Sequence, residues 1–144
     1  MRRVSISVLF LTVLFLFTTS SFAQTEENFH VMHIQTWKMK SLPTGDDATA
    51  FADMMKRQAT VVNSDSRVLR SYVLRHFWGG DSRDLVMVAE FNSRDEMFAF
   101  YQDLGSLLEK AYSKEQLDKD DMLFSKYVGE HGDEIYRVVN DTRK

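Results

Sequence analysis

The stretch from Arg70 to Met97 reads RSYVLRHFWGGDSRDLVMVAEFNSRDEM and contains several structural signals in a row. Residues from Val68 to Phe77 and from Leu85 to Phe91 are rich in β-branched and aromatic side chains, which is typical of strands. The Gly-Gly pair between them favours a hairpin, because glycine readily adopts the positive φ of tight turns. Residues 93–96, Ser-Arg-Asp-Glu, form a capping box in front of a helix. The stretch therefore predicts strand, hairpin, strand and helix.

The flanking sequence extends this order in both directions. An aromatic, imperfectly alternating segment at 30–40 predicts a first strand, and helical spacing of apolar residues predicts a helix from Asp46 or Asp47 to about 62. Further helices are predicted at 94–112 and 114–128, and Gly132 separates the second of them from a last strand at 134–140. The result is an α+β, ferredoxin-like βαββαβ antiparallel sheet with helices on one face and an extra helix before the last strand.

The N-terminus has the pattern of a secretory signal peptide. Arg2 and Arg3 precede an apolar run at 8–17, and the small residues Ser21 and Ala23 suit cleavage before Gln24. The alternative is a membrane anchor, but about ten apolar residues are short for a bilayer core. The sequence predicts a signal peptide at 1–23, a polar lead-in at 24–29 and one domain at 30–144. The protein is expected to be exported, periplasmic or secreted, with no stable membrane anchor.

Composition narrows the classes of partner. Loss of the two arginines in the leader leaves 16 basic against 21 acidic residues, so the net charge changes from −3 to −5. An acidic domain without a basic cluster is a poor match for nucleic acid or for anionic membranes. The chain has no cysteine, so an exported domain must be held together by its hydrophobic core rather than by disulfides.

The sheet plan predicts a homodimer. Helices cover one face of such a sheet, and the other face is left open. The central strands around Val73 and Val86–Val88 are apolar on both faces, so a second copy is the simplest cover for the open one. Two sheets would then close into one barrel.

Arg70 to Met97, with its Gly-Gly-Asp-Ser-Arg-Asp hairpin, its Val-Met-Val-Ala-Glu-Phe strand and its serine-capped helix, resembles the dimeric α+β barrel superfamily. The His-Gly-Asp-Glu-Ile-Tyr segment at 131–136 adds a likeness to its uncharacterised exported members. That superfamily includes cofactor-independent monooxygenases, haem-degrading enzymes and isomerases, so the fold alone selects no activity. The monooxygenases and haem-degrading members commonly carry a histidine on the helix after the third strand. Residues 94–112 contain none, which disfavours haem.

The candidate site follows from the hairpin register. A two-residue turn at Gly80-Asp81 would pair Phe77 with Asp84, and it would put one set of side chains in the barrel lumen: Ser71, Val73, Arg75, Phe77, Val86, Val88 and Glu90. Charged groups there must be paired or solvated. Arg75 could bind an anionic or carbonyl oxygen and Glu90 could act as a base, or the two could form a structural ion pair.

The first and last strands supply further candidates for the same lumen. His33 is the best acid, base or ligand, with Gln35 and Trp37 beside it, while Tyr136 could offer a phenol and His131 could pair with Asp133 or be solvated. No metal site is expected, because histidines at 30 and 33 point to opposite faces of a strand. The apolar stripe Met97, Phe98, Phe100 and Tyr101 is interpreted as core rather than as a ligand groove.

Three functions remain open. The first is binding of a small apolar or aromatic molecule without catalysis. The second is a cofactor-independent monooxygenase or isomerase that uses His33, Arg75 and Glu90. The third is a non-catalytic structural or interaction domain. No phosphate-binding loop or dinucleotide fingerprint occurs, so no cofactor is expected.

Overall fold

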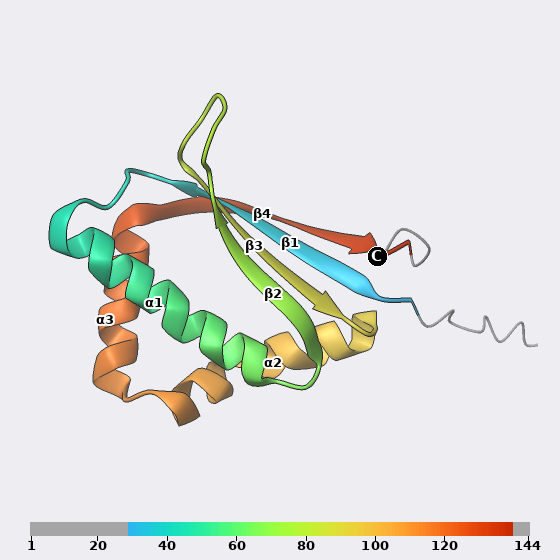
Figure 1. Ribbon diagram of the computed structural model, residues 1–144. Coiled ribbons are helices and arrows are strands. Elements are labelled where there is room, and N and C mark those ends of the chain that lie inside the picture. The colour runs from blue at the N-terminus through green and yellow to red at the C-terminus, as the bar shows by residue number, and fades with distance from the viewer. Residues whose placement is uncertain (1–28, 140–144) are drawn as a thin grey trace, which may run out of the picture.

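The computed structural model of the protein describes residues 29–139, so the predicted signal peptide and most of the lead-in lie outside the described residues. Four strands form one sheet in the order β2-β3-β1-β4, every neighbouring pair is antiparallel, and three helices lie on one face (Figure 1). The elements are β1 (Val31–Met39), α1 (Gly45–Ser64), β2 (Val68–Arg75), β3 (Asp84–Phe91), α2 (Arg94–Ala111), α3 (Lys114–Tyr127) and β4 (Val128–Arg137). The predicted βαββαβ plan with its extra helix is confirmed.

Serine residues begin the two C-terminal helices. The Ser93 hydroxyl accepts from the backbone N–H of Glu96 at 3.2 Å, as a capping box requires, and the Ser113 hydroxyl accepts from the backbone N–H of Gln116 at 3.3 Å. The Glu96 carboxylate accepts from Asn92 Nδ2 at 3.0 Å. Each cap satisfies an N–H group that the helix itself leaves unpaired.

The register of the hairpin differs from the predicted one by a single residue. Arg75 lies opposite Leu85, and Ser71 lies opposite Ala89 rather than Glu90. The connection is a long loop rather than a two-residue turn, and only Gly79 within it has a positive φ, of 137°. Because side chains alternate along a strand, this slip moves every β2 side chain to the opposite face.

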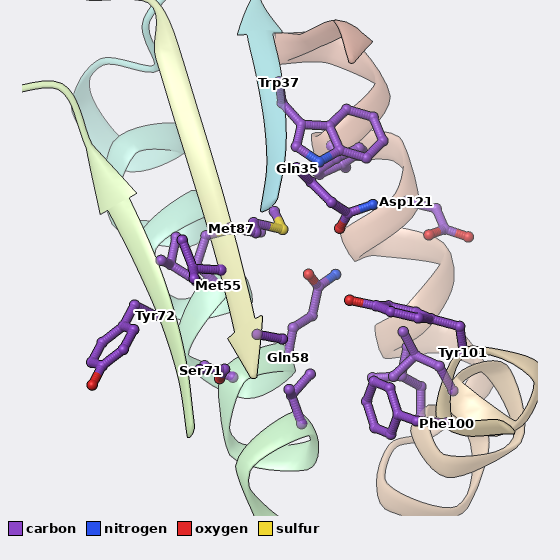
Figure 2. Close-up of a pocket in the computed structure, with 18 residues that line it drawn as sticks. Gln35, Trp37, Met55, Gln58, Ser71, Tyr72, Met87, Phe100, Tyr101 and Asp121 are labelled. Atoms are coloured by element: carbon purple, nitrogen blue, oxygen red, sulfur yellow. The ribbon is translucent and has the colours of Figure 1, made fainter. Parts of the chain in front are cut away.

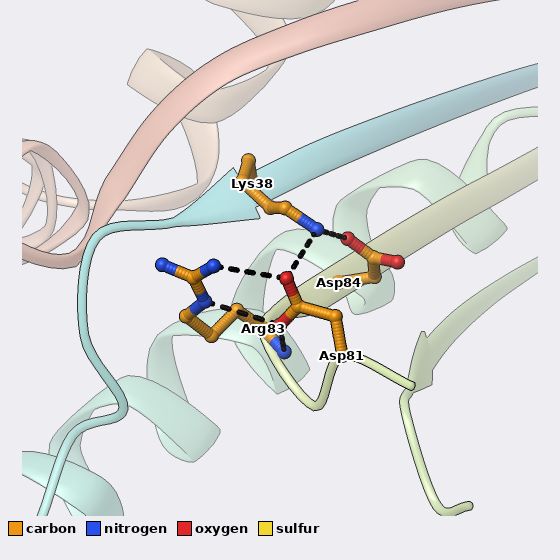
Figure 3. A network of polar contacts seen from close by, with 4 residues as sticks. All are labelled: Lys38, Asp81, Arg83 and Asp84. Atoms are coloured by element: carbon orange, nitrogen blue, oxygen red, sulfur yellow. Dashed lines mark hydrogen bonds and ion pairs between the residues drawn. The ribbon is translucent and has the colours of Figure 1, made fainter. Parts of the chain in front are cut away.

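Polar contacts hold the base of that loop against β1. Lys38 Nζ donates to Asp84 Oδ1 at 2.6 Å and pairs with Asp81 Oδ2 at 3.0 Å, while Arg83 donates to both oxygens of Asp81 (Figure 3). These hydrogen bonds, the one from Arg83 first, lower the pKa of Asp81 far below its ordinary value. The Asp81 turn thus lies just beyond the end of the β2–β3 ladder, whose last pair is Arg75–Leu85.

The last strand begins earlier than predicted. β4 runs from Val128 to Arg137 rather than from 134 to 140, so His131, Gly132 and Asp133 belong to a strand and not to a loop. Gly129 lies within the pairing irregularity opposite Lys38, where a Cβ would be 3.0 Å from the Lys38 carbonyl oxygen. The glycines of β4 therefore permit close strand approach or occupy open edge positions, and they do not break the strand.

Two hydrophobic clusters join the helices to the sheet. One surrounds Met54 and Leu85 beneath α1 and α3, and the other surrounds Phe91 and Phe100 beneath α2. Phe29, predicted to belong to the polar lead-in, packs against the second cluster, and the Arg137 guanidinium lies 4.6 Å from its ring centroid. Within residues 29–139, no helix has the length and apolar character needed to cross a membrane.

Candidate functional site

A cavity of about 360 Å³ lies between the sheet and its helices. Its walls come from α1, α2 and α3 on one side and from β1, β2 and β3 on the other, and most of its lining is apolar (Figure 2). The two hydrophobic clusters leave this space between them. Its volume falls within the range of small-molecule pockets, about 300–1,000 Å³.

Few polar side chains line the cavity: Gln35, Trp37, Gln58, Ser71, Tyr101 and Asp121. Trp37 Nε1 is buried and has no hydrogen-bond partner among the described residues. A buried indole N–H without a partner is costly, because it has lost its hydrogen bonds to water. Ser71, by contrast, donates to Asn63 Oδ1 at 2.9 Å.

A chain of hydrogen bonds leads from the cavity wall to the sheet edge. The Tyr101 hydroxyl lies 2.7 Å from His33 Nδ1, and His33 Nε2 lies 3.0 Å from Asp133 Oδ1. Gln35 Nε2 also donates to Asp133 Oδ1, at 2.8 Å. The buried His33 is thus held on both sides by groups from α2 and β4. This is the arrangement of an acid–base group that is oriented by a carboxylate.

Electrostatics fix the protonation states at both ends of this chain. Burial raises the pKa of Tyr101 to about 12, and the nearby charge of Asp133 adds to the effect. Partial burial alone would raise the pKa of Asp133, but hydrogen bonds from Gln35 and His33 outweigh it and hold this pKa below its ordinary value of 3.8. At neutral pH, Tyr101 is therefore a phenol and Asp133 a carboxylate.

His131 connects Asp133 to the outer end of the cavity. Its Nε2 lies 2.9 Å from Asp133 Oδ2, and its ring stacks on Trp37 with centroids 3.9 Å apart. The predicted His131–Asp133 pair is therefore present, although it lies on a strand. Stacking on His131 and an edge contact with Phe124 hold the Trp37 indole in place.

The remaining predicted site residues do not join this cluster. Glu90 is buried on the sheet face away from the helices, within 3.3 Å of His30 Nδ1 and of Arg70 Nε. Arg75 lies on the helix-facing side of exposed β2 and is not paired with Glu90, so the expected Arg75–Glu90 pocket is wrong. The shifted register is the cause.

Two other expected lumen residues are also elsewhere. Tyr136 lies opposite Met32 on β1, one position along from the Ile135–His33 pair, and therefore on the face opposite His33. Phe77 is fully exposed in the hairpin loop. Of the candidates, His33, Gln35, Trp37, Ser71 and His131 share the helix-facing side of the sheet, whereas they were expected in the lumen.

Tyr101 and Asp133 are the residues that the sequence interpretation missed as a pair. Tyr101 belongs to the apolar stripe that predicts core. Its hydroxyl indicates a polar partner, because a buried tyrosine usually forms a hydrogen bond. Asp133 was considered only beside His131. Its place opposite Gln35 follows from the pairing of β4 with β1. Within residues 29–139, no cluster of three or more metal-ligating side chains is found.

Comparison with known proteins supports the fold. No family model and no curated protein matches the chain. Among solved structures, a dimeric ferredoxin-like protein of unknown function from Bacteroides fragilis is 11% identical, with 76% of this chain and 96% of that chain covered and a TM-score of 0.53. A proposed antibiotic biosynthesis monooxygenase from Nitrosomonas europaea is 14% identical, with 81% and 97% covered and a TM-score of 0.54.

A dimeric ferredoxin-like protein of unknown function from Thermobifida fusca is 8% identical, with 78% of this chain and 93% of that chain covered and a TM-score of 0.51. At these identities the likeness is one of fold. The predicted ferredoxin-like α+β fold is confirmed by these likenesses.

Proposed function

We propose that the protein binds a small, largely apolar or aromatic molecule in the cavity between its sheet and helices. The observation that carries this proposal is the cavity of about 360 Å³ itself, whose lining is largely apolar and includes the side chain of Trp37. The cavity favours ligand binding over a purely structural role, because a tightly packed domain leaves few voids of this size.

Trp37 itself provides the assay. The chain has two tryptophans, and the other, Trp78, is 90% exposed in the hairpin loop. Trp78→Phe therefore leaves Trp37 as the only indole. We expect the neutral fluorophore N-phenyl-naphthylamine to gain emission in the presence of this variant and to quench Trp37.

A matched pair of substitutions locates the bound probe. Ala59 lines the cavity, whereas Ala52 is exposed on the same helix. Ala59→Phe should abolish the Trp37 quenching, and Ala52→Phe should leave it unchanged. Quenching that survives Ala59→Phe, or no quenching in the parent variant, would contradict binding in this cavity.

We propose further that two copies associate through the uncovered sheet face. Within residues 29–139, its apolar side chains are Met32, Ile34, Tyr72, Leu74, Val86 and Val88, and α1, α2 and α3 lie on the other face of the sheet. Tyr72 and Leu74 are each 50% exposed, which is costly in a contiguous apolar patch. Two of the proteins with similar structures are described as dimeric.

Light scattering tests this association. The wild-type protein should have twice the mass of one chain, and Leu74→Asp should shift it to the monomer. Leu42→Asp, at a 39% exposed leucine of the β1–α1 loop, is the control and should remain dimeric. A monomeric wild-type protein at micromolar concentration would refute the proposal.

Export is also a proposal, supported by the basic, apolar and small-residue segments of the N-terminus. We expect the intact mass of the protein recovered from its own compartment to correspond to a chain that begins at Gln24. Retention of residues 1–23 would contradict cleavage.

A cofactor-independent oxygenase or isomerase is the second candidate. The observation that favours it is the hydrogen-bonded chain Tyr101–His33–Asp133 at the cavity wall. One protein of similar fold is a proposed monooxygenase. Both reactions begin with removal of a proton from an acidic substrate, which requires a positioned base.

A further inference from the structure

We propose that Tyr101, His33 and Asp133 form a proton relay that accepts the proton of an acidic hydroxyl group, a phenol or an enol, on a ligand in the cavity. This inference rests on the proposed function, since it requires a ligand beside Tyr101. It assigns the ligand a chemical class and gives each of the three residues a role.

The direction of the relay follows from the hydrogen bonds. Asp133 is a carboxylate, so His33 donates from Nε2 to Asp133 Oδ1 at 3.0 Å. A neutral His33 then carries its lone pair on Nδ1, which accepts the Tyr101 hydroxyl proton at 2.7 Å. The lone pairs of the Tyr101 oxygen remain free to accept from a ligand. In Figure 2 this oxygen points into the cavity between Gln35 and Gln58.

The proposed step moves two protons and no other atoms. The ligand O–H bond breaks and its proton goes to the Tyr101 oxygen, while the Tyr101 O–H bond breaks and its proton goes to His33 Nδ1. The ligand keeps the electron pair as a phenolate or enolate, and His33 becomes an imidazolium paired with Asp133. This is the logic of a nucleophile–histidine–carboxylate triad, with a phenol in the place of the serine hydroxyl.

The charge does not remain on Tyr101. Its pKa of about 12 makes a buried tyrosinate costly, so Tyr101 passes the proton on rather than holding the negative charge. The imidazolium is stabilised by a charge-assisted hydrogen bond to Asp133. Tyr101 would touch the ligand and His33 would receive the relayed proton, so both are catalytic residues, whereas Asp133 is a positioning residue.

Other charged groups face the relay from β4 and α3. His131 Nε2 lies 2.9 Å from Asp133 Oδ2, and a positive charge on His131 would stabilise the ionised form of Asp133. Asp121 of α3 lines the cavity and would oppose an anionic ligand, but it is exposed, so solvent screens its charge. Glu90 lies on the opposite face of the sheet and does not contact the relay.

The same hydrogen bonds could simply tether α2 to the sheet, so the test needs a readout that a structural role would not change. Para-nitrophenol supplies one, because only its phenolate absorbs visible light. Its absorbance is titrated against pH, free and with saturating protein. We expect the bound probe to ionise about one pH unit lower than the free probe, as beside an opposite charge.

Tyr101→Phe removes the acceptor oxygen and keeps the ring. We expect it to bind the probe and to lose the shift, so that the bound probe ionises at or above the pH of the free one. Tyr136→Phe makes the same change on the other sheet face, outside the lining of the cavity, and should keep the wild-type shift. Asp133→Asn, at the exposed sheet edge, should reduce the shift without removing Tyr101.

Each outcome decides between the proposals. If bound para-nitrophenol ionises at the same pH in the wild-type protein and in Tyr101→Phe, the relay is overturned and the binding function stays intact. If N-phenyl-naphthylamine occupies the cavity but para-nitrophenol does not bind, the assigned ligand class is wrong. If neither probe enters the cavity, the binding function itself fails. A Tyr101→Phe variant that unfolds would leave Asp133→Asn to decide, and a full shift in it would refute the relay.

Discussion

Filling the cavity should stabilise the protein while it removes binding. Ala59→Phe directs a phenyl ring into an apolar space of about 360 Å³ bordered by Phe100 and Leu104. Burying a phenylalanine side chain stabilises by ~2 kcal/mol. The lower helix propensity of phenylalanine costs ~0.5 kcal/mol, and ordering its side chain costs a similar amount, ~0.5 kcal/mol. The expected net gain in the free energy of unfolding is therefore about 1 kcal/mol.

Thermal and urea unfolding measure this gain directly. For a domain of this size, 1 kcal/mol corresponds to an increase in Tm of roughly 4 °C. Ala52→Phe has the same propensity cost without the burial, so its Tm should fall slightly. The free energy of unfolding should thus rise in Ala59→Phe and fall in Ala52→Phe, with a difference of ~1.5 kcal/mol between the two variants.

A loss of stability in Ala59→Phe would contradict an open cavity. Phenylalanine forced into a core that is already filled costs ~1–3 kcal/mol. A fall of that size in Ala59→Phe would mean that the space between sheet and helices is closed in solution. The cavity, and the binding proposed for it, would then have to be abandoned.

Three further predictions concern the framework around the site. Gly129→Ala should lower the free energy of unfolding by ~1 kcal/mol in urea titration, because its Cβ would lie 3.0 Å from the Lys38 carbonyl oxygen. Gly132→Ala, whose Cβ would have nothing within 4 Å, should be neutral or slightly stabilising. Equal effects of the two substitutions would contradict a close approach of the strands at Gly129. Asp120→Ala should lower the free energy of unfolding by ~2 kcal/mol in the same titration, because it leaves the half-buried Arg57 without its bidentate partner at 2.5 and 3.2 Å. Asp118→Ala removes an exposed pair on the same helix and should lower it by less than ~0.5 kcal/mol. A small effect of Asp120→Ala would show that the Arg57–Asp120 pair does not hold α1 to α3. Hydrogen bonds from the Arg67 side chain lower the pKa of Asp65 below 3.8, so the stabilising contribution of Asp65 is complete above pH 3.8 and is lost as the pH falls through the lowered pKa. Asp65→Asn should therefore make the free energy of unfolding less dependent on pH in this acidic range, while Asp53→Asn should not. Identical acid-unfolding profiles for the two variants would contradict the role of Asp65.

Local patterns in the sequence were enough for the element order. The Ser93 capping box, the apolar spacing of α1 and the alternation of β1 each depend on residues a few positions apart, and each element forms where it was expected. For the same reason His33, Gln35 and Trp37 could be assigned to one side of one strand, since alternation within a strand needs no knowledge of its neighbours.

Pairing between strands decided the candidate site. The hairpin ladder ends at Arg75–Leu85, before the turn that Asp81 forms with Arg83 and Lys38, and its one-residue shift in register moves Arg75 away from Glu90. The close approach of Gly129 to the Lys38 carbonyl starts β4 early and brings Asp133 opposite Gln35. The Asp81–Arg83 contact is local, but the contacts of Lys38 with Asp81 and with Gly129 join residues far apart in the chain and have no local signature.

The order of elements and the side of β1 that carries His33 follow from local sequence patterns, and so does the expectation of export. The face of the sheet on which His33 lies, between Tyr101 of α2 and Asp133 of β4, follows from the folded chain. This division arises from the two-residue period of a strand. Local preference sets the alternation, but register, fixed by distant contacts, sets which side chains meet.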